Sequence, residues 1–253
     1  MNPDSSNQLT ITGASQGMTK KLPENTFLMT SGDNFQQVWK DYQKGVETQL
    51  LLPFSPKSLQ SNFSKFTGLN FEKQFLPWMT GNFAVGVIPN GDKARNAGVA
   101  FFVQVNDKTA AENALRELET KMQEKYSFQM SETQVNDQAV VRWRVPRNLQ
   151  IASRGWLEDK TLFFTLFAPI TEQITQSESS LASNEMFTQA TRSELAPKSG
   201  QFFFDVTQLT KFMGASPFLP KLTLSIKTMP RSLSLLVERA RPSMIGVLVI
   251  KLM

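Results

Sequence analysis

The spacing of hydrophobic positions changes from segment to segment along this chain, and the changes predict alternating strands and helices. TFLM at 26–29 has the apolar character of a short strand. The turn SGD follows, and SGD can also cap a helix. Apolar residues then recur every three to four positions, at Phe35, Val38, Trp39, Tyr42 and Val46. This spacing places them on one face of a helix.

Two further helices are indicated by their caps. Ser55 is a favoured cap and Pro56 a favoured first residue, so a helix is expected to begin there and to end at Gly68. Asp107 is expected to cap the longest helix, in which Glu112/Arg116 and Glu117/Lys121 pair at i,i+4. The apolar stripe of this helix consists of Ala111, Ala114, Leu115, Leu118, Met122 and Tyr126.

The middle of the chain predicts antiparallel strands joined by hairpin turns. FAVGVIP at 83–89 is an almost continuous apolar run, typical of a strand covered on both faces, and we expect it to pair with 98–105. After the long helix, turns at Asn136-Asp137 and Glu158-Asp159 separate further strand patterns. These patterns predict an antiparallel meander of segments 127–135, 139–146, 149–157 and 161–167.

Strand and helix patterns recur in the last third. Ile170 and Ile174 have helical spacing, and Ser183 is expected to cap the next helix. GQFFFDV and then TQLTKFMG, together 200–214, repeat the strand-then-helix order seen earlier, which suggests related structural units. The segments 233–239 and 244–252 predict a terminal hairpin.

Together these elements predict an α+β fold, with a mainly antiparallel sheet and helices packed on one face. The other face is expected to be partly open. Residues 1–21 are polar and are expected to form a flexible linker, because they bury too little apolar surface to offset the entropy of ordering. Residues 22–253 are expected to form one domain, with a division into 22–168 and 169–253 as the alternative.

The amino-acid composition limits the kinds of catalytic and metal-binding site that the protein can form. The 253 residues contain no Cys and no His, which excludes thiolate nucleophiles, imidazole bases and most zinc and haem sites. No phosphate-binding, serine-hydrolase or calcium-loop motif occurs. We therefore predict a non-enzymatic protein without cofactor or metal, and keep a hydrolase built on carboxylates or Ser/Lys as the lesser alternative.

The stretch VVRWRVPRN at 140–148 supplies the candidate interaction residues. Strand alternation places Arg142 and Arg144 on one face and Trp143 on the other, and Arg147 and Arg154 extend the basic segment. We favour a solvated or ion-paired strand face, with contact to an acidic protein or an anionic membrane surface as the alternative. Nucleic acid is not expected, because such sites interleave aromatic rings and cations on one surface.

The charged and aromatic residues elsewhere in the chain can each have either a structural or a functional role. The formal net charge is +5, and residues 198–253 hold eight basic and two acidic side chains; a solvated surface is favoured over a binding patch. Asp205 is expected to cap a helix near Thr207, with an acid of raised pKa as the alternative. The Phe doublets are expected to pack in the core instead of lining a ligand pocket.

No membrane-spanning segment is expected, since no run of 18 or more apolar residues occurs and 244–253 is too short. The N-terminus lacks the apolar core of a signal peptide. The protein is therefore expected to be cytoplasmic, or periplasmic or lumenal if a targeting segment has been removed.

Several local motifs resemble one family. FEKQFLPWMTGNFAVGVIP contains Pro77-Trp78, Gly81 and Pro89, VNDKTAAENAL contains an Asp-Lys helix start, and SLASNEMFTQATRSEL is a Ser-Leu-Ala-x-Asn segment. Over residues 22–212 the chain resembles the cyanobacterial proteins grouped as domain of unknown function 3352. The resemblance implies a non-enzymatic accessory or protein-interaction domain at the periplasmic or thylakoid-lumenal side of a photosynthetic membrane. The alternative is a protein that binds lipid or another hydrophobic ligand in a groove between helices and sheet.

Overall fold

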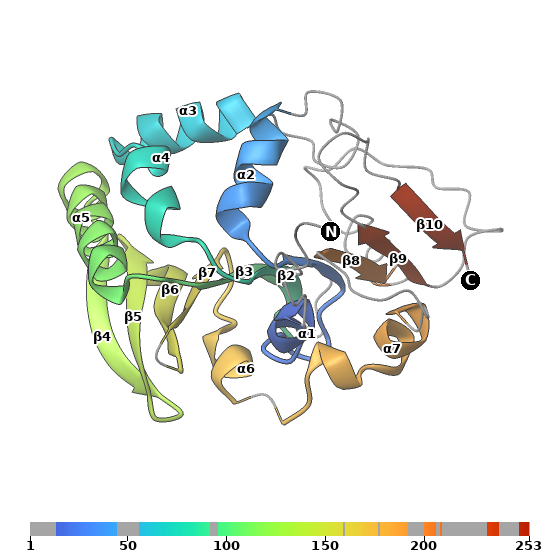
Figure 1. Ribbon diagram of the computed structural model, residues 1–253. Helices are drawn as coiled ribbons and strands as arrows, with labels where there is room; N and C mark the ends of the chain where they lie inside the picture. Colours follow the sequence, from blue (N-terminus) through green and yellow to red (C-terminus); the bar gives the residue numbers. More distant parts are fainter. Residues whose placement is uncertain are drawn as a thin grey trace, which may run out of the picture.

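The computed structural model describes residues 14–44, 56–91, 96–158, 160–176, 178–191, 200–205, 208, 232–237 and 248–252. Its centre is an antiparallel sheet of ten strands in the order β10-β9-β8-β1-β2-β3-β7-β6-β5-β4 (Figure 1). The strands are β1 (Leu28–Gly32), β2 (Phe83–Pro89), β3 (Ala97–Gln104), β4 (Gln129–Val135), β5 (Gln138–Val145), β6 (Leu149–Leu157), β7 (Thr161–Leu166), β8 (Gly200–Asp205), β9 (Ser232–Val237) and β10 (Leu248–Leu252). The α+β class and the mainly antiparallel sheet are confirmed.

Helices cover both faces of this sheet, so the prediction of a single covered face is corrected (Figure 1). One face carries α2 (Phe35–Lys44), α3 (Pro56–Thr67), α4 (Phe71–Gln74), the 3-10 helix η2 (Leu76–Trp78) and α5 (Lys108–Tyr126). The other carries α1 (Ala14–Thr19), α6 (Thr171–Thr175), the 3-10 helix η3 (Leu181–Ser183) and α7 (Glu185–Thr191). We call these the long-helix face and the short-helix face.

Each face has its own hydrophobic core because successive side chains of a strand point to opposite sides. On β3, Phe102 packs with Met29 and Phe163 on the short-helix face, whereas Val103 packs with Leu115 on the long-helix face. This explains the almost continuous apolar runs of the central strands. The Phe doublets are core residues, one ring to each layer, as expected.

Helix α1 occupies part of residues 1–21, over which a flexible linker was expected. Met18 of this helix is 1% exposed and joins the core of the short-helix face together with Leu22. Met18 in the helix and Leu22 after it therefore anchor this otherwise polar segment in the core. Residues 1–13 lie outside the described part of the chain.

The hairpins are formed as predicted, whereas some boundaries shift. β1 begins at Leu28 and extends to Gly32, because Gly32 pairs with Phe83 on one side and Gly200 on the other. The terminal hairpin is confirmed by the antiparallel pairing of β9 and β10. The helix predicted at 207–214 lies outside the described residues, apart from Gln208.

Helix caps account for several local predictions. Asp107 accepts a hydrogen bond from the backbone N–H of Ala110, as expected. Asn184, not Ser183, caps α7, since its side chain accepts from the N–H of Phe187, and Ser183 instead closes the capping box of η3. Asp205 acts as predicted and accepts from the N–H of Gln208.

Replacing Asp107 with alanine is expected to lower the free energy of unfolding by about 1 kcal/mol, because the first turn of the 19-residue helix α5 loses its side-chain acceptor. Asp107→Asn keeps an equivalent acceptor and should unfold like the original chain. Urea unfolding of the two variants measures the difference. Equal midpoints for the alanine and asparagine variants would show that the cap contributes nothing.

Candidate functional site

The four arginines predicted as one interaction surface do not lie together. Arg142 pairs with Glu172 of α6 at 2.7 Å, and Arg144 donates to Ser131 on β4 at 2.8 Å, both on the short-helix face. Arg147 is exposed in the turn between β5 and β6. Arg154 is only 5% exposed and lies under α5 on the opposite face, so it does not belong to the predicted surface.

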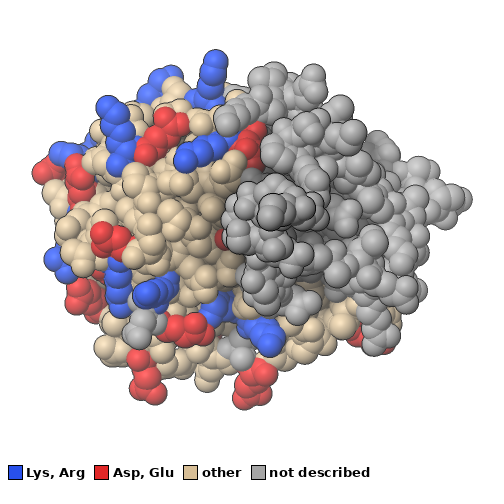
Figure 2. Space-filling view, viewed as in Figure 1, with Lys and Arg blue, Asp and Glu red and all other residues tan. Residues whose placement is uncertain are grey.

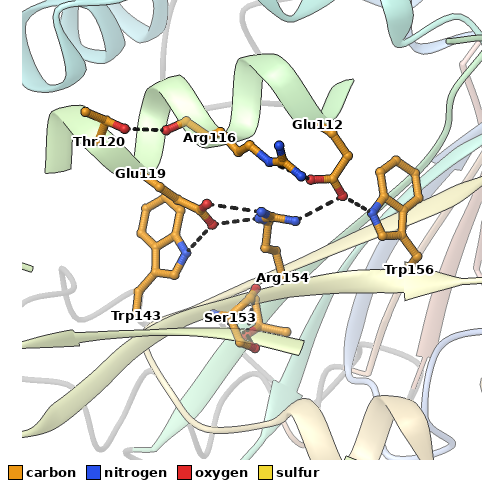
Figure 3. A network of polar contacts seen from close by, with 9 residues as sticks. Glu112, Arg116, Glu119, Thr120, Trp143, Ser153, Arg154 and Trp156 are labelled. Carbon is orange, nitrogen blue, oxygen red and sulfur yellow. Dashed lines mark hydrogen bonds and ion pairs between the residues drawn. The ribbon is translucent and has the colours of Figure 1, made fainter. Parts of the chain in front are cut away.

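Arg154 is instead the centre of a buried polar network (Figure 3). Its Nε and Nη2 donate to the two carboxylate oxygens of Glu119 at 2.7 and 3.0 Å, and its Nη1 donates to Glu112 at 3.3 Å. The indole N–H of Trp143 donates to Glu119 at 3.2 Å, and that of Trp156 donates to Glu112. The network fastens α5 to β5 and β6.

The electrostatics of this network are those of a structural ion-pair cluster. Burial by itself lowers the pKa of Arg154, but hydrogen bonds and charges from Glu119 and Glu112 outweigh it and raise the pKa above its usual value. The guanidinium therefore stays charged. Each of the two carboxylates accepts hydrogen bonds from Arg154 and from an indole N–H.

Sequence reasoning missed this network, although two signals were present. Glu119 lies within the apolar stripe of the long helix, between Leu118 and Met122, where a charged residue needs a buried partner. Arg154 is two residues from both Ala152 and Trp156, which strand alternation places on the same face. The pairing itself joins residues 35 positions apart, which no local pattern specifies.

A cleft of about 690 Å³ lies on the short-helix face, at the end of the sheet where β2 and β5 begin and β3 and β6 end. The floor of the cleft is formed by residues that lie side by side on neighbouring strands. Gln104 of β3 lies opposite Thr161, Thr161 lies opposite Leu157 of β6, and the N–H of Gln104 bonds to Asn82 before β2. The remaining lining comes from α1 and the residues after it, from β5 and from α6: Gly17, Met18, Lys20, Lys21, Gln138, Glu158, Ile174, Thr175 and Gln176.

Unused hydrogen-bonding groups gather in this cleft. The side-chain amides of Asn82, Gln104, Gln138 and Gln176 bond to no other side chain or backbone group that the structure describes. At the rim, Lys21 and Glu158 form an ion pair at 2.7 Å. An amide both donates and accepts, so the cleft suits a polar ligand that offers N–H and C=O groups.

The charged groups on one face of the described part are mixed. Figure 2 shows lysine and arginine interspersed with aspartate and glutamate over the described part of one face. Among the described residues no group of three or more acidic side chains is placed to hold a metal ion. No helix in that part of the chain is both long and apolar enough to cross a bilayer.

The family model described as protein of unknown function (DUF3352) matches residues 1–236. The chain belongs to this family. The match extends beyond the 22–212 expected from motifs. No curated protein and no solved structure matches the chain. The Pro77-Trp78 segment, on which part of the resemblance was based, is structural here, because Trp78 is buried and its indole N–H donates to the carbonyl of Gln74 at 2.7 Å.

Proposed function

We propose that this member of the DUF3352 family is a non-enzymatic binding module that holds a polar segment of a partner protein in the sheet-end cleft. The observation that carries the proposal is the group of side-chain amides around the cleft floor: Asn82, Gln104, Gln138 and Gln176. Such amides match the alternating N–H and C=O groups of a peptide backbone.

The distribution of charged groups favours binding over catalysis. The buried Glu119 and the half-buried Glu112 are held by Arg154 and two indoles, and Glu158 at the cleft rim is paired with Lys21. General acid–base catalysis needs a titratable group within reach of the substrate and free to exchange its proton. The cleft instead offers hydrogen-bonding groups and a concave surface, which suit binding.

The second candidate, a hydrophobic ligand held between helices and sheet, is disfavoured by ring packing. On the long-helix face, Phe35 lies with its ring centroid 5.2 Å from those of Phe83 and Phe101, and Trp39 lies 4.9 Å from Phe71. These edge-to-face and tilted contacts pack α2 against β2, β3 and α4, where a hydrophobic ligand would otherwise have to lie. We therefore place the ligand site at the polar cleft.

The cellular setting is part of the proposal. We infer from the likeness described above that the partner belongs to a photosynthetic membrane system, on its periplasmic or lumenal side. The mixed surface charge fits a protein partner better than nucleic acid, which is bound through extended basic surfaces.

A photo-crosslinking amino acid at Gln138 is expected to trap one partner of defined mass in native membranes, because this position lies in the cleft. The matched control is Gln134, an exposed glutamine on the adjacent strand β4. Gln138→Arg, which removes one amide and narrows the cleft, should weaken binding of the identified partner about tenfold, or 1.4 kcal/mol. Identical products from positions 138 and 134, or none from either, would refute a role for the cleft.

A further inference from the structure

The end of the sheet opposite the cleft has an unusual surface. Among the described large hydrophobic residues, Phe167 at 72% and Leu149 at 64% are the most exposed. Phe167 follows β7 and Leu149 begins β6, and the N–H of Phe167 bonds to the carbonyl of Ile151 at 2.8 Å. The two apolar side chains therefore project from neighbouring strand ends. Single exposed apolar residues are common, whereas two at the ends of neighbouring strands point to a contact surface.

The backbone at these tips is held in an unfavourable conformation. Phe167 has φ 75°, and Arg147 and Asn148 in the adjacent turn have φ 79° and 63°. A bulky side chain in the left-handed region is rare, because its Cβ crowds the backbone. Ala168 and Ile170, which follow Phe167, are buried. The chain thus turns the ring outward while anchoring the next residues in the core, which is the kind of strain found at binding sites.

The sequence on either side of the two apolar residues carries positive charge and no negative charge. Residues 145–149 and 166–170 contain Arg147 and no acidic residue. Arg144 at the end of β5 bonds to the neutral Ser131, and no acid of the described residues neutralises it. Arginines beside projecting apolar side chains suit the boundary between anionic headgroups and acyl chains, where the rings and aliphatic groups enter the bilayer and the guanidinium groups meet phosphate.

We propose that this apolar tip, defined by Arg144, Arg147, Leu149 and Phe167, docks the protein on an anionic lipid surface. The inference rests on the proposed membrane association and names the lipid contact through which it acts. We assign a membrane as the single binding partner of the tip. Two loop tips that carry arginines can insert into a lipid interface without a partner surface of complementary shape.

The topology gives this contact an orientation. β5 begins at Gln138 in the cleft and ends at Val145 near the tip, and β6 runs back from Leu149 to Leu157 in the cleft. Eight residues of strand separate the two ends by roughly 25 Å. A tip resting on lipid therefore leaves the cleft facing away from the membrane, open to a partner.

Flotation with vesicles tests the proposal. The full chain should float with vesicles of phosphatidylcholine and phosphatidylglycerol, and much less with phosphatidylcholine alone. Leu149→Ser/Phe167→Ser and Arg144→Gln/Arg147→Gln should each lower the bound fraction about fivefold, because one removes apolar insertion and the other the headgroup contact. The matched controls lie on α3, where Leu59→Ser/Phe66→Ser and Lys57→Gln/Lys65→Gln should float like the original chain.

The Phe167→Gly variant distinguishes a loss of membrane docking from a loss of folding stability. Glycine adopts the left-handed conformation without crowding, so this variant should unfold at the same temperature as the original chain or higher. It should nevertheless lose flotation. Undiminished flotation of Phe167→Gly, equal binding to neutral vesicles, or equal losses in the α3 controls would overturn the proposal. The flotation assay uses vesicles of pure lipid that contain no partner protein, so a failure of the tip is distinguishable from a failure of the cleft, which is scored by the crosslink at Gln138.

Discussion

Glu119→Leu is expected to lower the free energy of unfolding by about 3–5 kcal/mol, because it leaves the buried guanidinium of Arg154 without its closest counter-charge. Trp143 also loses the acceptor of its indole N–H. For a chain of this length the loss corresponds to a fall in melting temperature of roughly 10 °C. Urea unfolding, followed by tryptophan fluorescence and circular dichroism, measures the change.

A double-mutant cycle with Arg154→Met shows whether the effect comes from the pair. Replacing both partners with apolar residues of similar size removes the unpaired charge, so the double variant should regain about 2–3 kcal/mol relative to the sum of the single losses. Glu117→Leu is the matched control on the same helix, since Glu117 is exposed and should change stability by less than about 0.5 kcal/mol. If Glu119→Leu and Glu117→Leu cost the same, the network is not a stabilising feature.

The parts of the fold that were predictable are those with local causes. The type of turn at Asn136-Asp137, with φ 50° and 62°, is one that these residues tolerate, and it sets the β4–β5 hairpin. The apolar stripe and the cap at Asp107 likewise define α5 from its own sequence. Such elements need no knowledge of the rest of the chain.

The cleft was not predictable because its floor depends on strand register. Asn82, Gln104, Leu157 and Gln138 come from four separate segments, and each looks like an ordinary strand end in the sequence. They become neighbours only after β7 has inserted between β3 and β6. The exposure of Phe167 is hidden for a similar reason, since its apolar neighbours predict a buried ring and its backbone conformation turns it outward.

For the arginine segment, one prediction agrees with the structure and another is wrong. Alternation correctly separates Trp143 from Arg142, and the ion pair of Arg142 with Glu172 fits the favoured explanation of a paired strand face. The grouping of Arg154 with the others was wrong, because the register places it opposite Val141, on the α5 side of the sheet. Closeness in sequence across a hairpin does not place side chains on one face.

Gly155→Ala is expected to destabilise the fold by about 3 kcal/mol, because this position has no room for a methyl group. A Cβ there would lie 2.6 Å from Cε1 and 2.7 Å from Cζ of Phe163, and 2.8 Å from the carbonyl oxygen of Ala139. Gly155 lies directly opposite Phe163 in the β6–β7 register, and the ring, which is fully buried, rests on the glycine. Overpacking of this kind usually costs about 1–3 kcal/mol, and the approach to a backbone carbonyl places Gly155 at the upper end.

Phe163→Leu alone should cost roughly 1.5 kcal/mol, less than the 3–5 kcal/mol of truncating a buried Phe to alanine. In the Gly155→Ala background the same change removes the ring atoms that meet the new methyl group, so the double variant should be about 1–2 kcal/mol more stable than the sum of the single effects. The contact with Ala139 remains, and rescue is therefore incomplete. Gly17→Ala is the control, since its Cβ meets no atom within 4 Å and alanine favours the helix α1. Strictly additive losses at positions 155 and 163 would mean that the ring does not impose glycine on the facing strand, and that the absence of a side chain there has another cause.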